Sequence, residues 1–171
     1  NDYIRFPSEW ERNEEVFRIL DEQTGNNTEV SIACAVQALN IFYIPDFLKW
    51  KLNFGFKKIN MWPFGAGGIN YHFVYHPPHL NVKILPAWFK DELERKYEDF
   101  IPWWEENWEK GIPSWHKGKI TQEQWRTASY GISRLRGMVS FMKSEDWSQR
   151  MPEFREYITK LDKMRGTNFC E

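Results

Sequence analysis

This chain of 171 residues has few cysteines, almost no net charge and no long apolar run. Only two cysteines occur, Cys34 and Cys170, which excludes a disulfide framework and any cysteine pair at zinc spacing. With a formal charge of -1 the chain has no net electrostatic attraction to nucleic acid or anionic membranes, so we expect neither partner. No apolar run approaches the ~20 residues that span a bilayer. The first residues do not resemble a signal peptide, and we expect a cytoplasmic protein.

Aromatic residues are the compositional excess, with 10 Trp, 13 Phe and 7 Tyr. Such side chains carry a large apolar area and usually form a core or an interface. An aromatic core is the simplest interpretation. The alternative is that some rings face a ligand or a partner, and the candidates are Trp103, Trp104, Trp108 and Trp115.

One stretch in the first half of the chain has the pattern of a strand, a helix and a second strand. Residues 29–36 form a short apolar run rich in β-branched residues, which predicts a buried strand. Apolar positions recur at helical spacing over residues 46–54, and Gly55 offers a C-terminal stop. Residues 58–62 resume a strand pattern. A helix between two buried strands implies a parallel pair, so we predict the α/β class with any site at the carboxyl ends of the strands.

Helices dominate the remaining sequence. Apolar stripes and capping signals predict further helices over residues 8–21, 86–100, from 121 onward, and 152–164. Pro102 is expected to kink or end the second of these helices. Residues 71–75 and 80–85 predict two short strand-like runs that form an irregular lid or a sheet edge. We therefore divide the chain into a sheet-containing part, residues 1–85, and a helical part, residues 86–171.

Polar or aromatic side chains lie at the end of each of the two predicted strands. Gln37 and Asn40 follow the first strand, and Asn60 and Trp62 lie at the end of the second. Because carboxyl ends of parallel strands meet at one edge of a sheet, this placement fits a cofactor site. Asn40 could equally cap the helix that follows it.

Three histidines form a second candidate site: His72, His76 and His79. Neutral imidazole is a common metal ligand, and three imidazoles could hold Zn²⁺ with one position open. No carboxylate is interleaved, and two prolines separate His76 from His79. A surface or structural role is the simpler interpretation of these histidines.

Four segments carry a resemblance to a known family. They are YIRFPSEW at residues 3–10, VSIACAVQALNIFYIP at 30–45, INMWP at 59–63 and LDKMRGTNFCE at 161–171. In order and local sequence they resemble the second half of twitch-domain radical S-adenosylmethionine (SAM) proteins of marine bacteria and their phages. The resemblance implies a partial (β/α)₆ barrel that binds SAM and a [4Fe-4S] cluster. It makes residues 29–36 and 58–62 the fifth and sixth strands, and it implies cofactor contacts near Gln37, Asn40, Asn60 and Trp62.

The chain departs from this family at the cluster motif. The family binds its cluster through Cys-x₃-Cys-x₂-Cys, and no such run occurs here. The resemblance therefore implies a barrel remnant, the SAM-covering and substrate-facing C-terminal part of an enzyme, inactive alone and binding neither SAM nor cluster without the missing N-terminal half. An open strand edge in such a remnant predicts self-association into a homo-oligomer. The alternative is a standalone aromatic-rich binding or interaction module without catalysis.

Overall fold

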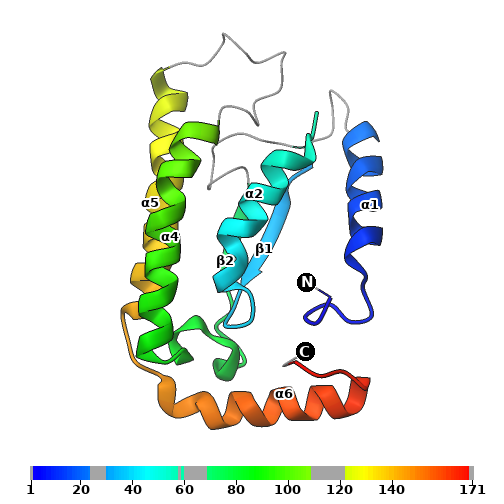
Figure 1. Ribbon diagram of the computed structural model, residues 1–171, viewed down its shortest axis with the longest axis vertical. Helices are drawn as coiled ribbons and strands as arrows, with labels where there is room; N and C mark the ends of the chain where they lie inside the picture. Colours follow the sequence, from blue (N-terminus) through cyan, green and yellow to red (C-terminus); the bar gives the residue numbers. More distant parts are fainter. Residues whose placement is uncertain (1, 24–29, 58, 60–68, 109–121, 170–171) are drawn as a thin grey trace.

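The computed structural model describes residues 2–23, 30–57, 59, 69–108 and 122–169. These residues form an α/β structure in which a small parallel sheet lies among helices (Figure 1). The strands are β1 (Ile32–Val36) and β2 (Ile69–Phe73), and the helices are α1 (Trp10–Gln23), α2 (Ile44–Phe54), α4 (Ala87–Asn107), α5 (Gln122–Lys143) and α6 (Met151–Arg165). Short 3₁₀ turns connect them, namely η1 (Ile41–Tyr43), η2 (Pro78–Leu80), η3 (Val82–Ile84) and η6 (Ser148–Arg150).

The predicted strand–helix–strand unit is present, but its second strand is not the one that the sequence favoured. β1 pairs in parallel with β2, and the register runs from Ile32 opposite Ile69 to Val36 opposite Phe73. Residues 58–62 lie outside the described residues except for Ile59, which is buried in a bend. Residues 71–75 were predicted as a strand-like run in a lid or at a sheet edge, and β2 confirms the strand at an edge. Its buried Ile69 and half-buried Tyr71 and Phe73 alternate with the exposed polar Asn70 and His72. That alternation is what a strand with only one covered face requires.

The sheet is covered by helices on one face only. Ile32 and Val36 of β1 and Ile69 of β2 are buried on that face. The residues that alternate with them are exposed, and they are Ala33, Ala35, Asn70 and His72. Parallel sheets normally have both faces covered. The second face of this sheet is therefore open within the described structure.

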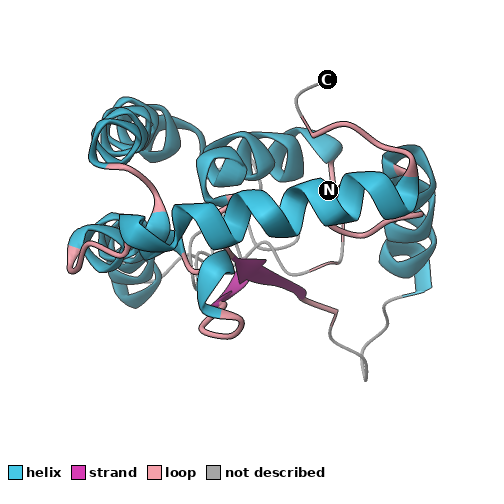
Figure 2. Ribbon diagram, turned by 90° about the horizontal axis from the view of Figure 1, so that it is seen from below, coloured by secondary structure: helices cyan, strands magenta, loops and turns pink. Residues whose placement is uncertain are grey.

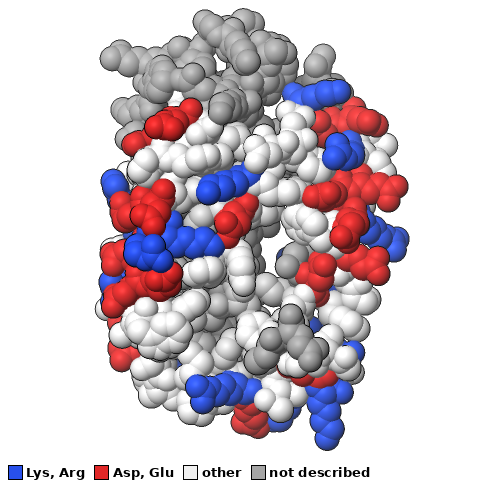
Figure 3. All heavy atoms as spheres, in the orientation of Figure 1, with Lys and Arg blue, Asp and Glu red and all other residues white. Residues whose placement is uncertain are grey.

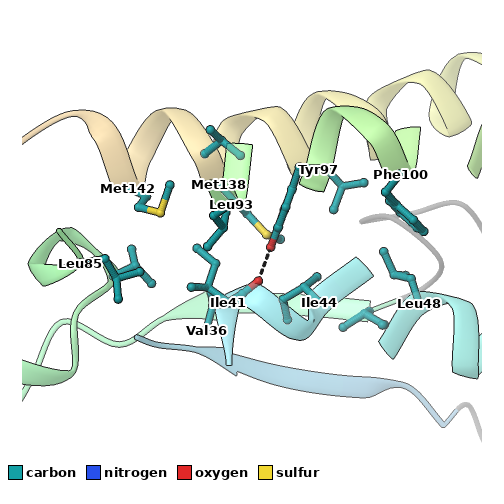
Figure 4. Packing of buried hydrophobic residues seen from close by; sticks show 14 of the residues in the cluster. Val36, Ile41, Ile44, Leu48, Leu85, Leu93, Tyr97, Phe100, Met138 and Met142 are labelled. Atoms are coloured by element: carbon teal, nitrogen blue, oxygen red, sulfur yellow. Dashed lines mark hydrogen bonds between the residues drawn. The ribbon is translucent and has the colours of Figure 1, made fainter. Parts of the chain in front are cut away.

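The main core lies between the covered face of the sheet, α2 and the pair α4–α5 (Figure 4). Leu93 and Tyr97 of α4 point toward α2 and the sheet, and Met138 and Met142 of α5 close the core behind them. The Tyr97 hydroxyl donates a hydrogen bond of 2.7 Å to the Ile41 carbonyl. This bond pairs the buried Tyr97 hydroxyl, so the hydroxyl does not destabilise the apolar core around it.

The helix that begins near residue 86 was predicted to kink or end at Pro102, and the structure shows that it does not end there. α4 continues through Pro102 to Asn107. Ile101 and Trp104 are buried on either side of the proline, and this burial offsets the lost backbone hydrogen bond. By contrast, the predicted stop of α2 at Gly55 is confirmed, with Gly55 in the left-handed region at φ 78°.

α6 runs across one end of the other helices and returns the chain to its beginning (Figure 2). Arg165 near the end of α6 donates a hydrogen bond of 2.7 Å to the Tyr3 carbonyl. The rings of Tyr3 and Phe169 lie 5.0 Å apart between centroids. The two ends of the described chain therefore hold each other, which fixes the segment before α1.

Candidate functional site

A cavity of about 720 Å³ lies between the segment before α1, α1 itself, β1 and α2. α1 stands apart from the sheet on the side of β1 that is away from β2 (Figure 1). On the face shown in Figure 3, most acidic and basic side chains lie over α4 and over α1, and the strip between them is mainly uncharged. The charged residues that line the cavity are Arg5 and Asp46, and Asp46 is paired with Lys96.

β1 contributes its edge to the cavity, not only one face. Four consecutive residues from Ile32 to Ala35 line the cavity. The Val36 carbonyl accepts a hydrogen bond of 2.9 Å from the Val74 N–H, on the side of β2. In a strand the backbone groups of successive residues point to alternate sides. The N–H and C=O groups of Ala33 and Ala35 therefore point away from β2, toward the cavity.

Asn40 covers one end of this edge with its side chain. Its Nδ2 donates to the Ala35 carbonyl at 2.8 Å, and its Oδ1 accepts from the Gln37 N–H at 2.9 Å. It stands at the N-cap position of η1, but its side chain makes no capping bond there. Asn40 thus lies in the cavity, as predicted for a site residue, with both ends of its carboxamide already engaged.

Gln37 is the second predicted site residue that the structure brings to the cavity. Its side chain lines the cavity, and the residue is only 7% exposed. Within the described residues its carboxamide has no hydrogen-bond partner. The carboxamide is therefore available to form a hydrogen bond with a molecule bound in the cavity. The other two predicted site residues, Asn60 and Trp62, lie outside the described residues.

Aromatic rings form the wall opposite β1. The Trp10 and Trp50 rings lie 4.8 Å apart between centroids, and Phe47 stacks on Trp50 at 5.3 Å. Glu14 Oε1 accepts hydrogen bonds from the indole N–H groups of Trp10 at 3.0 Å and Trp50 at 2.6 Å. The carboxylate thereby ties α1 to α2 and fixes both indoles.

These rings were not singled out from the sequence. Trp104 and Trp108, which were considered, are buried in the core, Trp103 is half-buried, and Trp115 lies outside the described residues. The spacing of Trp10 and Glu14, four residues apart in a helix, was the only available signal. Trp50, the second indole that donates to Glu14, meets this pair only when α1 and α2 come together in the fold.

Cys34 also lines the cavity, as a neutral thiol. Burial raises its pKa to about 11, and the nearby Arg5 guanidinium lowers the pKa by a smaller amount. The thiolate is the form that binds metals and acts as a nucleophile. Cys34 is therefore a small wall residue at neutral pH.

The three histidines do not come together. His72 is exposed on the open face of the sheet, and His76 is exposed beyond it. The His79 ring lies 4.9 Å from the Tyr157 ring of α6. Among the described side chains, which include all three histidines, no group of three His, Cys, Asp or Glu residues is arranged to hold a metal ion.

No protein-family model, curated protein or solved structure matches this chain. Over the described ranges, no helix combines the length and the apolar character that crossing a bilayer requires. The functional interpretation therefore depends on the geometry of the cavity and the sheet and on the resemblance in local sequence.

Proposed function

We propose that this chain is the cofactor-covering and substrate-facing part of a larger (β/α) enzyme of the radical SAM class, and that it has no activity alone. The observation that carries the proposal is a parallel sheet with helices on one face only. In a (β/α) barrel the helices cover only the outer face of the sheet, and the site lies at the carboxyl ends of the strands. The open face has small and polar side chains, namely Ala33, Ala35, Asn70 and His72.

The free edge of β1 supports the same proposal. A barrel closes only when each strand has a neighbour on both sides. β1 has β2 on one side and a cavity on the other. The proposal assigns the strands on that other side to the N-terminal half of a barrel within the same polypeptide.

The residues at the end of β1 fit SAM better than they fit an iron–sulfur cluster. Gln37 lines the cavity at the carboxyl end of β1, and its carboxamide would bind polar groups of the cofactor there. Asn40 contributes less, because both ends of its carboxamide are engaged. When bound in such enzymes, SAM supplies a carbon-centred radical after one-electron reduction.

A [4Fe-4S] cluster does not fit the described residues. Cluster binding takes several thiolates, and Cys34 is a single neutral thiol with a pKa of about 11. We therefore assign no catalytic step to this chain.

The DNA upstream of the codon for Asn1 provides the direct test. We expect the same reading frame to encode Cys-x₃-Cys-x₂-Cys, and the longer protein, reconstituted anaerobically with iron and sulfide, to release 5′-deoxyadenosine from SAM. Gln37→Ala should raise the Kd for SAM about tenfold, since it removes a hydrogen bond to a buried partner worth about 1.5 kcal/mol. Gln149→Ala, at an exposed glutamine of η6, is the matched control and should leave the Kd unchanged. A start codon directly before Asn1, with no such motif upstream, would overturn the proposal.

A standalone binding module is the second candidate, and the aromatic-walled cavity favours it. Its volume of about 720 Å³ lies within the usual range of small-ligand pockets. Native mass spectrometry of the purified chain separates the two candidates. A small molecule that copurifies with the chain and is lost in Phe47→Ala would support the module, and a ligand-free chain would count against it.

A further inference from the structure

The backbone groups along the edge of β1 are the feature that the proposed cofactor site does not use. Asn40 occupies the Ala35 carbonyl and the Gln37 N–H, which lie at the carboxyl end of the edge. The N–H and C=O of Ala33 and the N–H of Ala35 remain directed into the cavity. Nothing in the described chain pairs with this part of the edge, since the sheet there consists of β1 and β2.

The cavity has room for one strand. Neighbouring strands lie about 4.8 Å apart, layers about 10 Å apart, and five residues of strand extend about 17 Å, which gives a slot of about 800 Å³. The cavity beside the five residues of β1 measures about 720 Å³. α1 covers the slot with Trp10, Asn13 and Phe17, which lie on one face of the helix. A slot with a backbone edge on one side and a helix above it is the usual environment of a buried strand.

Charge at the rim restricts the chemistry of the strand further. Arg5 lines the cavity, is exposed, and forms no ion pair among the described residues. The covered side of the slot is apolar, whereas the open face of the sheet is small and polar. The complementary strand therefore alternates apolar with polar residues and carries a carboxylate near Arg5.

We infer that the cavity is a docking slot for an extended strand of about five alternating residues, with a carboxylate at one end, that continues the sheet at β1 beneath α1. The origin of that strand in a barrel half rests on the proposed function, but the pairing itself follows from the free edge. The mode is strand addition, in which main-chain hydrogen bonds provide affinity and alternate side chains provide specificity.

The test uses the acetylated and amidated hexapeptide Val-Thr-Val-Thr-Val-Asp as the probe. Its binding to the full chain is followed by the fluorescence of Trp10 and Trp50, which line the slot. Ala33→Pro removes the one N–H that points into the slot at that position and leaves the β1–β2 hydrogen bonds intact. Ala33→Ser keeps both backbone groups and is the matched control. We expect Ala33→Pro to weaken peptide binding at least tenfold and Ala33→Ser to change it less than twofold.

Arg5→Glu is the second variant and does not depend on the folding of Ala33→Pro, because Arg5 is exposed. It should weaken binding of the Asp-ended peptide several-fold and leave binding of an Asn-ended peptide unchanged. If wild type and both variants bound the Asp-ended peptide with equal affinity, the inference that the cavity is a docking slot for a strand would be wrong.

Light scattering tests the alternative that a second copy of the chain occupies the slot. A dimer that Ala33→Pro dissociates and that the peptide does not displace would assign the edge to self-association and overturn the inferred partner. Peptide binding does not depend on the upstream DNA. An upstream cysteine motif without peptide binding would reject the slot alone, and peptide binding without the motif would reject the radical SAM proposal alone.

Discussion

The α4–α5 side and the α1 side of the molecule have similar amphipathic helices but different packing. α4 buries five large apolar residues, namely Leu93, Tyr97, Phe100, Ile101 and Trp104. α1 buries one residue, Asp21, while its apolar Val16 and Ile19 are 46% and 45% exposed. The contrast shows that an apolar stripe becomes buried only where a second apolar layer faces it.

Polar contacts anchor α1 in addition to the packing of the Trp10 and Phe17 rings. Asp21 accepts hydrogen bonds from the N–H groups of Lys57 at 2.8 Å and Ile59 at 2.6 Å. Toward the other end of the helix, Glu14 accepts from two indoles. α1 is thus anchored at two points above a cavity. We interpret it as a cover whose underlying layer is the strand inferred above.

The largest expected difference between the two sides is in the cost of removing an apolar side chain. Leu93→Ala should lower the free energy of unfolding by about 3 kcal/mol, because Leu93 is fully buried and a cavity would remain. Ile19→Ala in α1 should cost less than about 1 kcal/mol. Urea denaturation of both variants measures the difference. Equal costs would mean that α1 is packed as tightly as α4.

Removing the polar anchor of α1 is expected to have the next largest effect. Asp21→Ala leaves two backbone N–H groups without their acceptor and should cost about 2 kcal/mol. Asp21→Asn, which keeps one acceptor oxygen, should cost less. Glu11→Ala, at an exposed position of the first turn, is the control. If Asp21→Ala proved as mild as the control, the anchor would have no energetic role.

α2, which lies between the two sides, contains a buried lysine that should make stability depend on pH. Burial lowers the pKa of Lys51 to about 7 from its ordinary 10.5. Between about pH 7 and pH 10.5 the unfolded chain keeps this proton while the folded chain loses it, so the contribution of Lys51 to stability should rise over that window. Below pH 7 Lys51 is protonated in both the folded and the unfolded chain, so the folded chain bears the full free-energy cost of burying its charge.

Lys51→Met should remove this rise and stabilise the protein at neutral pH by roughly 1–2 kcal/mol. The quantity to measure is the free energy of unfolding of wild type and variant over the same pH window. The difference between them isolates Lys51 from Cys34, whose raised pKa of about 11 acts in the opposite direction only at higher pH. Lys160→Met, at an exposed lysine of α6, is the control. A variant with the same pH slope as wild type would contradict the assignment.

The smallest expected effect concerns the hydrogen bond at the centre of the packed side. Tyr97→Phe removes the donor to the Ile41 carbonyl and should cost about 1 kcal/mol. Tyr43→Phe, at a ring that is 61% exposed, should be neutral. Thermal unfolding of the pair checks this expectation, and a neutral Tyr97→Phe would show that water replaces the bond.

The sequence predicted the elements of the fold better than their pairing. The parallel strand–helix–strand unit and the stop at Gly55 followed from local patterns. The partner of β1 did not, because periodicity cannot decide which of two short runs pairs with a distant strand, and β2 alternates only because one face is open. Pro102 was given too much weight because burial of its neighbours is a tertiary effect.

The candidate site was predictable only where it depends on strand ends. Gln37 and Asn40 lie in the cavity, as their position after β1 indicated. The engagement of Asn40 by the edge of its own strand could not be read from the sequence, since it depends on the turn into η1. The meeting of Trp10 and Trp50 depends on how α1 lies against α2.

Amide hydrogen exchange along β1 tests the free edge most directly. In the monomeric chain we expect the N–H groups of Cys34 and Val36, which face β2, to be protected, and those of Ala33 and Ala35 to exchange at least tenfold faster. Adding the hexapeptide should protect Ala33 and Ala35 and leave Cys34 and Val36 unchanged. Uniform protection of all four groups in the monomer without peptide would contradict an open edge at β1.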